Sequence, residues 1–446
     1  MRQTARLPDD PSSAPPLPSR VRTVTRRRRA RRLLVLLVAG GLLAACGEGS
    51  GGSSSGPVRL NFYNFPDNSG AIQQAVDTCS QNSGGRYRIT YNKLPNGADG
   101  QRQQLVRRLA AHDKAMDILG LDVTWEAEFA EAGWIREWTG TNKQRASQGT
   151  LAVPLETATW KGRLYAVPYN SNTQLLWYRS DLVPKPPQTW DEMIDMAEAL
   201  AKQGKPHYIE IQGAQYEGVV VWFNTMVASA GGSVLTKDAS RPSLGQPAVE
   251  ALRVMHRLAT SPAADPSLSV QMEDANRLAM ESGTAAFQLN YPFVYPSMKA
   301  NQPKLFKNFK WTLYPRVKAD EPSHVTIGGI DLAISSYSRH PDLAFEAALC
   351  LRNRENQKVA AIKGGLPPTI ASLYDDPSLQ KDYPFRADIK KALDAASVRP
   401  KTPAYQNLSI VIAHAVSPPS KINPEKTERA MVGDLRDALA SKGLVP

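Results

Sequence analysis

The sequence predicts an α/β protein of two lobes, each a mixed, mainly parallel sheet flanked by helices. The chain has 446 residues and 42% of them are hydrophobic, so it exceeds the length at which a single core usually keeps growing. From Val58 onward, strand-like and helix-like segments alternate. This alternation is typical of a parallel sheet with helices on its faces. We therefore expect two cores rather than one.

The first lobe is predicted to begin with strand, helix, strand, helix and strand. Residues 58–62 and 86–91 alternate apolar and polar side chains as strands do, and residues 116–121 form a short apolar run. Residues 71–80 and 101–111 have helical patterns. Because the three strands are joined by helices, they are expected to be parallel.

Polar side chains follow two of these strands. Asn64 and Asp67 come after the first strand, and Asp122 comes after the third. Ligands of open α/β sheets bind beyond the carboxyl ends of the strands. The three side chains are therefore candidates for ligand contact, although Asp122 would also suit the N-cap of a following helix.

The second lobe is expected to begin near Pro168. Two later strand-like segments, residues 284–293 and 324–330, contain Pro or Gly near their ends and are predicted to be places where the chain crosses between lobes. These crossings give the expected division of the chain: residues 57–167 plus 291–329 in the first lobe, and 168–290 plus 330–446 in the second.

The formal net charge of +12 lies mostly in the first 45 residues. This segment holds ten arginines against Asp9 and Asp10, so residues 46–446 carry 44 basic and 40 acidic side chains, a net charge of +4. Binding to nucleic acid depends strongly on cationic side chains. We therefore expect no nucleic-acid partner.

The N-terminal segment has the pattern of a secretory signal peptide. An arginine cluster precedes the apolar run 33–43, which is too short to span a bilayer. The sequence Leu43-Ala44-Ala45-Cys46 that follows resembles the lipobox of bacterial lipoproteins. It implies that residues 1–45 are a signal peptide with an N-terminal extension, that Cys46 is lipidated, and that residues 46–56 tether the protein to the outer face of the membrane. An ordinary secretory peptide with a coincidental cysteine is the alternative.

Two cysteines, Cys79 and Cys350, remain in the rest of the chain. Outside the cytoplasm they could form a disulfide or stay as two buried thiols, and the sequence leaves both open. The six histidines are scattered and form no Cys/His cluster. We expect no metal ion and no cofactor.

Several segments closely resemble the maltose-type extracellular solute-binding protein family. Residues 160–168, 175–184 and 187–193 resemble its first crossing between lobes. Further segments match later parts of the family pattern: 281–287, 328–329 and 364–368. The resemblance implies a periplasmic-binding-protein-like fold with a multi-crossing hinge. It also implies a monomer that is not an enzyme, with a sugar as its ligand and an ABC permease pair driven by a cytoplasmic ATPase as its partner.

Within that family the likeness is greatest to trehalose-binding lipoproteins. It is carried by residues 121–134, 172–178, 217–224 and 398–400. The resemblance implies that trehalose is held by side chains from both lobes, with backbone groups of two glycines completing the site: Asn64, Asp67, Asp122, Asn172, Glu217, Arg399, Gly328 and Gly329. Another di- or oligosaccharide, such as a maltose-like glucan, is the alternative ligand.

The chemistry of these side chains suits a sugar. Carboxylates accept hydrogen bonds from hydroxyls, and the guanidinium of Arg399 donates to them. Tyr291 is the aromatic side chain expected to face a sugar ring, whereas Trp177 is expected in the core. Each assignment has an ordinary alternative, because Glu217 would also complement a helix dipole and a loop arginine is often solvated.

Two other classes of protein are weighed against a binding protein. Asp122 and Glu217 could form the carboxylate pair of a glycoside hydrolase, but the chain has no nucleophile elbow, metal motif or Ser/His/Asp order. A purely structural envelope lipoprotein would not need polar groups gathered at strand ends. We therefore expect a binding protein without catalytic activity.

Overall fold

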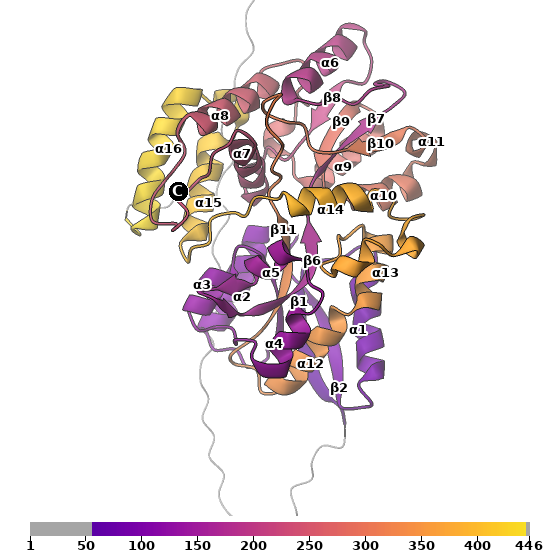
Figure 1. The fold of residues 1–446 in the computed structure, drawn as a ribbon, viewed down its shortest axis with the longest axis vertical. Coiled ribbons are helices and arrows are strands. Elements are labelled where there is room, and N and C mark those ends of the chain that lie inside the picture. The colour runs from indigo at the N-terminus through magenta and orange to yellow at the C-terminus, as the bar shows by residue number, and fades with distance from the viewer. Residues whose placement is uncertain (1–55, 443–446) are drawn as a thin grey trace, which may run out of the picture. The chain divides into compact units, whose positions relative to one another are not determined.

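The computed structural model describes residues 56–442. The predicted signal peptide, the lipidation of Cys46 and most of the tether lie outside the described residues. Two main sheets organise the described chain, with strand orders β2-β1-β3-β11-β6 and β10-β7-β9-β8. We call the sheet that contains β1 and its covering helices the first lobe, and the sheet that contains β7 and its covering helices the second lobe (Figure 1).

The first lobe packs helices against a five-stranded sheet. β1 pairs in parallel with β2 and β3, and β11 runs antiparallel to both β3 and β6. Its core includes Phe62, Phe129 and Trp138, which are fully buried. The elements of this lobe are β1 (Val58–Asn64), α1 (Ala71–Asn82), β2 (Tyr87–Lys93), α2 (Ala98–Ala110), β3 (Ile118–Asp122), α3 (Glu126–Glu131), α4 (Gly140–Ser147), α5 (Ala152–Thr157), β4 (Thr159–Trp160), β5 (Arg163–Leu164), β6 (Ala166–Asn172), β11 (Gly328–Ile334), α12 (Pro341–Leu351) and α13 (Arg354–Gly364).

The second lobe has a four-stranded sheet and a larger helical layer. The side chain of Thr189 caps α6 by accepting a hydrogen bond from the Glu192 amide, and Trp190 and Trp222 stack in the core. The elements of this lobe are β7 (Leu175–Arg179), α6 (Trp190–Lys202), β8 (Tyr208–Glu210), α7 (Glu217–Ser229), α8 (Gly245–Ala259), α9 (Glu273–Ser282), β9 (Ala285–Asn290), α10 (Val294–Asn301), α11 (Pro303–Phe306), β10 (Phe309–Thr312), α14 (Arg386–Asp394), α15 (Tyr405–Val416) and α16 (Pro424–Leu439). No helix within residues 56–442 is long and apolar enough to cross a membrane.

The first five predicted elements correspond to β1, α1, β2, α2 and β3. Both sheets are mixed, as predicted, but parallel pairs do not dominate. In the second sheet β7 is antiparallel to both β9 and β10, and only β8 and β9 are parallel. The late strands β10 and β11 return from long connections and pair antiparallel, which the early βαβ pattern does not reveal.

The crossings between lobes differ from the expected division of the chain. The segment 284–293 does not cross, because β9 pairs with β7 and β8 and the following β10 also pairs with β7. Residues 291–327 therefore belong to the second lobe. Gly328 begins β11, which lies in the first sheet, so the residues from 330 to the end of α13 belong to the first lobe. The chain thus crosses between β6 and β7, before β11, and after α13.

Cys79 in α1 and Cys350 in α12 form a disulfide with an S–S distance of 2.05 Å. The sequence left this bond and two free thiols open, and the structure contains the bond. Under the expected division Cys350 would lie in the second lobe, where a bridge to Cys79 would restrict the hinge. Because α12 packs on the first sheet beside α1, the disulfide lies within one lobe.

Candidate functional site

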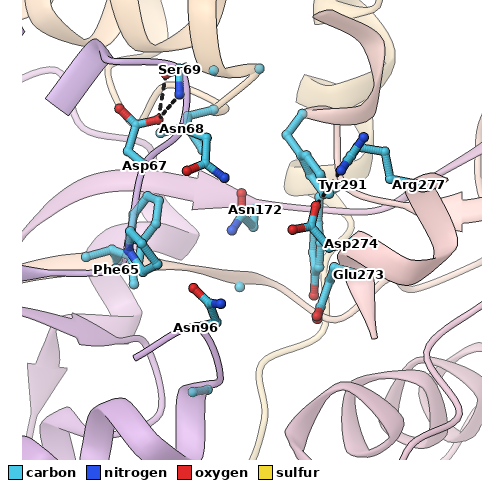
Figure 2. Close-up of a pocket in the computed structure, with 18 of the residues that line it drawn as sticks. Phe65, Asp67, Asn68, Ser69, Asn96, Asn172, Glu273, Asp274, Arg277 and Tyr291 are labelled. Carbon is cyan, nitrogen blue, oxygen red and sulfur yellow. Dashed lines mark hydrogen bonds and ion pairs between the residues drawn. The ribbon is translucent and has the colours of Figure 1, made fainter. Parts of the chain in front are cut away.

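A cavity of about 640 Å³ lies between the two lobes. Figure 2 shows side chains of both lobes around it: Phe65, Asp67, Asn96, Asn172, Glu273 and Tyr291. The volume is within the range of roughly 300–1,000 Å³ that small-molecule sites occupy. Asn172, at the end of β6 where the chain crosses to the second lobe, lies between the two groups of side chains. The cavity is therefore placed where the lobes meet.

Arg399 connects carboxylates from both lobes. Its side chain is almost completely buried, with 3% of the residue exposed, and its Nη1 donates to Glu217 Oε1. The other terminal nitrogen, Nη2, donates to Asp122 Oδ1 at 3.2 Å and to the carbonyl oxygen of Ile327 at 3.4 Å. A buried guanidinium needs such partners, because an isolated buried charge is very costly.

Asp122 is the last residue of β3, so its side chain lies beyond the carboxyl end of the strand. Its Oδ1 accepts hydrogen bonds from the Thr124 amide at 3.1 Å and the Thr124 hydroxyl at 2.8 Å, as well as from Arg399. Asp122 is not the N-cap of the following helix, because Trp125 occupies the N-cap position of α3. No hydrogen bond within residues 56–442 uses Oδ2, which leaves this oxygen available to a ligand in the cavity.

Glu217 is the first residue of α7 and lines the cavity from the second lobe. Its Oε1 accepts from Arg399 and from the Tyr405 hydroxyl, and its Oε2 accepts from the Ser409 hydroxyl. Burial raises the pKa of the Glu217 carboxyl above its ordinary value, while the positive charge of Arg399 opposes that rise. Much of the accepting capacity of Glu217 is thus used by protein groups that hold it in place.

Gly328 and Gly329 let the backbone of β11 approach β6 closely. Gly329 has φ +142°, and a Cβ on it would lie 2.4 Å from the Asn170 carbonyl oxygen. A Cβ on Gly328 would lie 3.3 Å from the Cβ of Asn172, its partner across the ladder. No hydrogen bond within the described residues engages the Asn172 side-chain amide, which therefore faces the cavity with both donor and acceptor capacity.

The two polar residues predicted after β1 have different positions. Asp67 lines the cavity, but its carboxylate accepts from Ser69 and from the Ile72 amide at the start of α1, so it shapes the loop. Asn64 is fully buried and does not line the cavity. Its Oδ1 accepts from the Phe65 amide at 2.9 Å, and it faces Gly120 of the neighbouring strand. The structure thus brings every predicted site residue of the described chain to the cavity except Asn64.

Tyr291 lines the cavity just after β9. Burial raises the pKa of its hydroxyl, which stays protonated and can donate a hydrogen bond. Trp177 is fully buried and donates through Nε1 to the Asn290 carbonyl oxygen, as expected of a core residue. Phe65 and Phe293 supply further aromatic surface to the cavity. Aromatic faces of this kind pack against the apolar parts of a ligand.

Other polar residues of the cavity were not predicted. Asn96 lines the cavity and follows β2. The rule that ligands bind beyond the carboxyl ends of strands, which we call the strand-end rule and which selected Asp122, would also have selected Asn96. Glu273 and Arg277 lie on α9, and burial raises the pKa of the Glu273 carboxyl. An acid at the start of a helix ordinarily complements the helix dipole. The sequence therefore gave no separate signal for Glu273.

The cavity combines hydrogen-bond acceptors, hydrogen-bond donors and aromatic faces from both lobes. Asp122 and Asn172 have unused polar atoms, and the Arg399 guanidinium donates to two carboxylates. Among the described residues no group of three acidic, His or Cys side chains is placed to hold a metal. This arrangement defines a two-lobed protein that binds a polar solute in the cleft between its lobes.

The chain belongs to the family of bacterial extracellular solute-binding proteins, which matches residues 67–358. This is the family that the crossing segments resemble, so the expected membership is confirmed. Its members are extracellular carriers that hold a solute and are not enzymes. A probable ABC transporter-binding protein of Deinococcus radiodurans is 24% identical over 365 residues, 78% of this chain and 86% of that protein. The maltotriose-binding protein of Pyrococcus abyssi is 23% identical over 63% of this chain and 60% of its own length.

Solved structures share the fold. The maltose-bound MalE3 of T. maritima has a TM-score of 0.79 and 24% identity, covering 85% of this chain and 99% of that one. The GacH receptor of Streptomyces glaucescens has a TM-score of 0.76 and 20% identity, covering 87% and 100%. The predicted two-lobed fold is therefore confirmed.

Proposed function

We propose that this protein is the solute-binding component of a sugar ABC importer, and that it captures trehalose in the cleft and delivers it to a permease pair for uptake. The observation that carries the proposal is the Arg399 guanidinium, which joins Asp122 of the first lobe to Glu217 of the second at the wall of the cavity. A sugar that contacts both lobes favours their closed arrangement, because its binding energy differs between the open and closed states.

The choice of trehalose rests on the resemblance of residues 121–134, 172–178, 217–224 and 398–400 to trehalose-binding lipoproteins. The proposed hydroxyl ligands are Asp122, Asn172, Glu217 and Arg399, with Tyr291 against a ring. Asp67 and the backbone of Gly328 and Gly329 complete the site, while the buried Asn64 accepts from the amide of Phe65, a residue that lines the cavity. Trehalose has two hexose rings, and a cavity of about 640 Å³ accommodates a ligand of that class.

A maltose-like glucan is the second candidate ligand. It is favoured by the maltose-bound MalE3 and the maltotriose-binding protein among the similar proteins. The lining of the cavity also includes Arg277 and Lys363, whose donors would suit the hydroxyls of a further ring. The two candidates differ in the linkage between rings, so one binding experiment separates them.

The proposed location is the outer face of the cell membrane, with a lipid on Cys46 and residues 46–56 as a tether. The proposal is supported by the lipobox-like sequence that ends at Cys46. A single acyl chain anchors only marginally, so stable attachment requires the two or three chains typical of bacterial lipoproteins. Mass spectrometry of the protein isolated from membranes tests this, and an unmodified Cys46 would contradict it.

Isothermal titration calorimetry against trehalose, maltose, maltotriose, sucrose and glucose tests the proposed function. We expect saturable heat with trehalose and at least tenfold weaker binding of the other sugars, a difference of about 1.4 kcal/mol. Saturable heat with maltose or maltotriose alone would replace trehalose by a glucan. No heat with any of the five sugars would contradict sugar binding, and release of glucose during the titration would contradict the absence of catalysis.

A further inference from the structure

Residues 399–406 form a short segment of the second lobe, which we call the strap. Before it, the Ser397 carbonyl oxygen accepts from the Ile327 amide. The strap ends in the first turn of α15, the helix that packs against α7 and α16. Within the strap, Arg399 and the hydroxyl of Tyr405 both contact Glu217. The strap is thus fixed to the second lobe through the same carboxylate that lines the cavity.

Three side chains of the strap reach across to the first lobe. Arg399 contacts Asp122 at the end of β3. Lys401 Nζ donates to two backbone carbonyl oxygens, at 2.7 Å to Glu156 in α5 and 2.6 Å to Thr159 in β4. Gln406 Nε2 donates to Asp99 Oδ1 at 2.9 Å near the start of α2. One segment of eight residues therefore contacts three separate parts of the opposite lobe.

Of these contacts, only the one between Arg399 and Asp122 lies at the cavity. Lys401, Gln406 and Asp99 are not among the residues that line it, so they are not placed to touch a ligand there. Their hydrogen bonds join one lobe to the other, so moving the lobes apart at these points would break them. Lys401 in particular is part-buried between the lobes, where its Nζ donates to both carbonyl oxygens.

We propose that the strap is a closure clamp. Lys401 and Gln406 of the strap, and Asp99 as the first-lobe partner of Gln406, are positioning residues that raise sugar affinity by stabilising the closed arrangement without touching the sugar. The inference rests on the proposed sugar-binding function. A ligand's apparent affinity is reduced by the fraction of protein that is not in the binding-competent state. Contacts that exist only in the closed state therefore increase affinity from a distance.

The test uses Lys401→Met, Gln406→Ala and Asp99→Ala in the full chain. Each should weaken sugar binding roughly two- to tenfold, as expected for the loss of one hydrogen bond, and the Asp99→Ala/Gln406→Ala double variant should be no weaker than the worse single variant. Lys401→Arg retains donors for both carbonyl groups and should keep most of the affinity.

Two matched controls make similar contacts within one lobe. Lys318 Nζ donates to the Ala230 carbonyl oxygen at 3.1 Å and also pairs with Glu250 Oε2 at 3.2 Å, both in the second lobe. Gln73 Nε2 donates to Asp77 Oδ1 at 2.9 Å within α1. Lys318→Met and Gln73→Ala remove contacts of the same chemistry and should leave affinity unchanged.

A second experiment measures the distance between the lobes directly. Fluorophores attached through unnatural amino acids at Asn82 in α1 and Asp437 in α16, both exposed, report the distance between lobes by energy transfer. The strap variants should shift the distribution toward open distances without sugar, whereas the two controls should match the unsubstituted protein. Unchanged affinity together with unchanged distances in the strap variants would overturn the clamp. If no sugar binds the unsubstituted protein, the proposed function fails, and the distances without sugar still decide the clamp.

Discussion

Arg399 brings one positive charge between carboxylates that come from different lobes, Asp122 and Glu217. At the scale of single residues, this feature could be predicted from the sequence only in part. The strand-end rule selected Asp122 from the alternation of β1 to β3, because polar groups at the carboxyl ends of parallel strands collect at one edge. Arg399 lies on a loop without periodicity, so only the family resemblance pointed to it.

Asn64 shows the limit of the same rule. The rule places a residue near the edge of the sheet but does not fix the direction of its side chain. Asn64 points toward Gly120, where its Oδ1 occupies the space that a Cβ on Gly120 would need. Which side of the strand end faces the cavity depends on the neighbouring strand, and the sequence of β1 alone does not contain that information.

Replacement of Arg399 by Ala should weaken sugar binding by about 1.5–3 kcal/mol, the range for hydrogen bonds to charged groups. The change removes donors from the site and leaves two carboxylates without their shared partner. Calorimetry with the tightest-binding sugar measures this loss of affinity. Arg352→Ala is the matched control, because Arg352 is also buried and donates to the carbonyl oxygens of Arg145 and Ala146, remote from the cavity. Equal affinity in the Arg399 variant would remove this residue from the site.

At the scale of elements, the early part of the chain was predictable and the later part was not. β1 to β3 and the helices between them follow each other locally, so their hydrophobic periods identify them. β10 and β11 pair with strands that lie more than a hundred residues earlier, β7 and β3. A Pro or Gly after a strand marks where the strand ends, but not which sheet receives the next one. This is why the expected crossing at 290–291 was wrong.

The disulfide between α1 and α12 closes a long loop within the first lobe. Replacing Cys79 and Cys350 together by Ser should lower the free energy of unfolding by about 2–5 kcal/mol, since the bond restricts the unfolded chain. Urea denaturation measures that change. Because the bridge does not span the lobes, sugar affinity should stay the same. A tenfold loss of affinity in the folded double variant would show that the bridge controls closure.

At the scale of the whole molecule, the length predicted two cores and the structure contains two sheets with separate cores. Three crossings join them, and together with the strap they bring Asp122, Glu217 and Arg399 to one cavity. The arrangement agrees with membership in a family of extracellular solute carriers. The composition of the chain could not locate the cavity, because its residues come from loops and helix ends spread from Phe65 to Arg399.

A crystal structure of the protein grown with trehalose tests most directly whether one carbohydrate is held jointly by the two lobes. We predict density for a single disaccharide in the cavity, with hydroxyls within hydrogen-bonding distance of Asp122 Oδ2 and the Asn172 amide. The same crystals should retain the contacts of Arg399 with both carboxylates. An empty cavity at saturating trehalose, or a sugar that contacts only one lobe, would contradict this account.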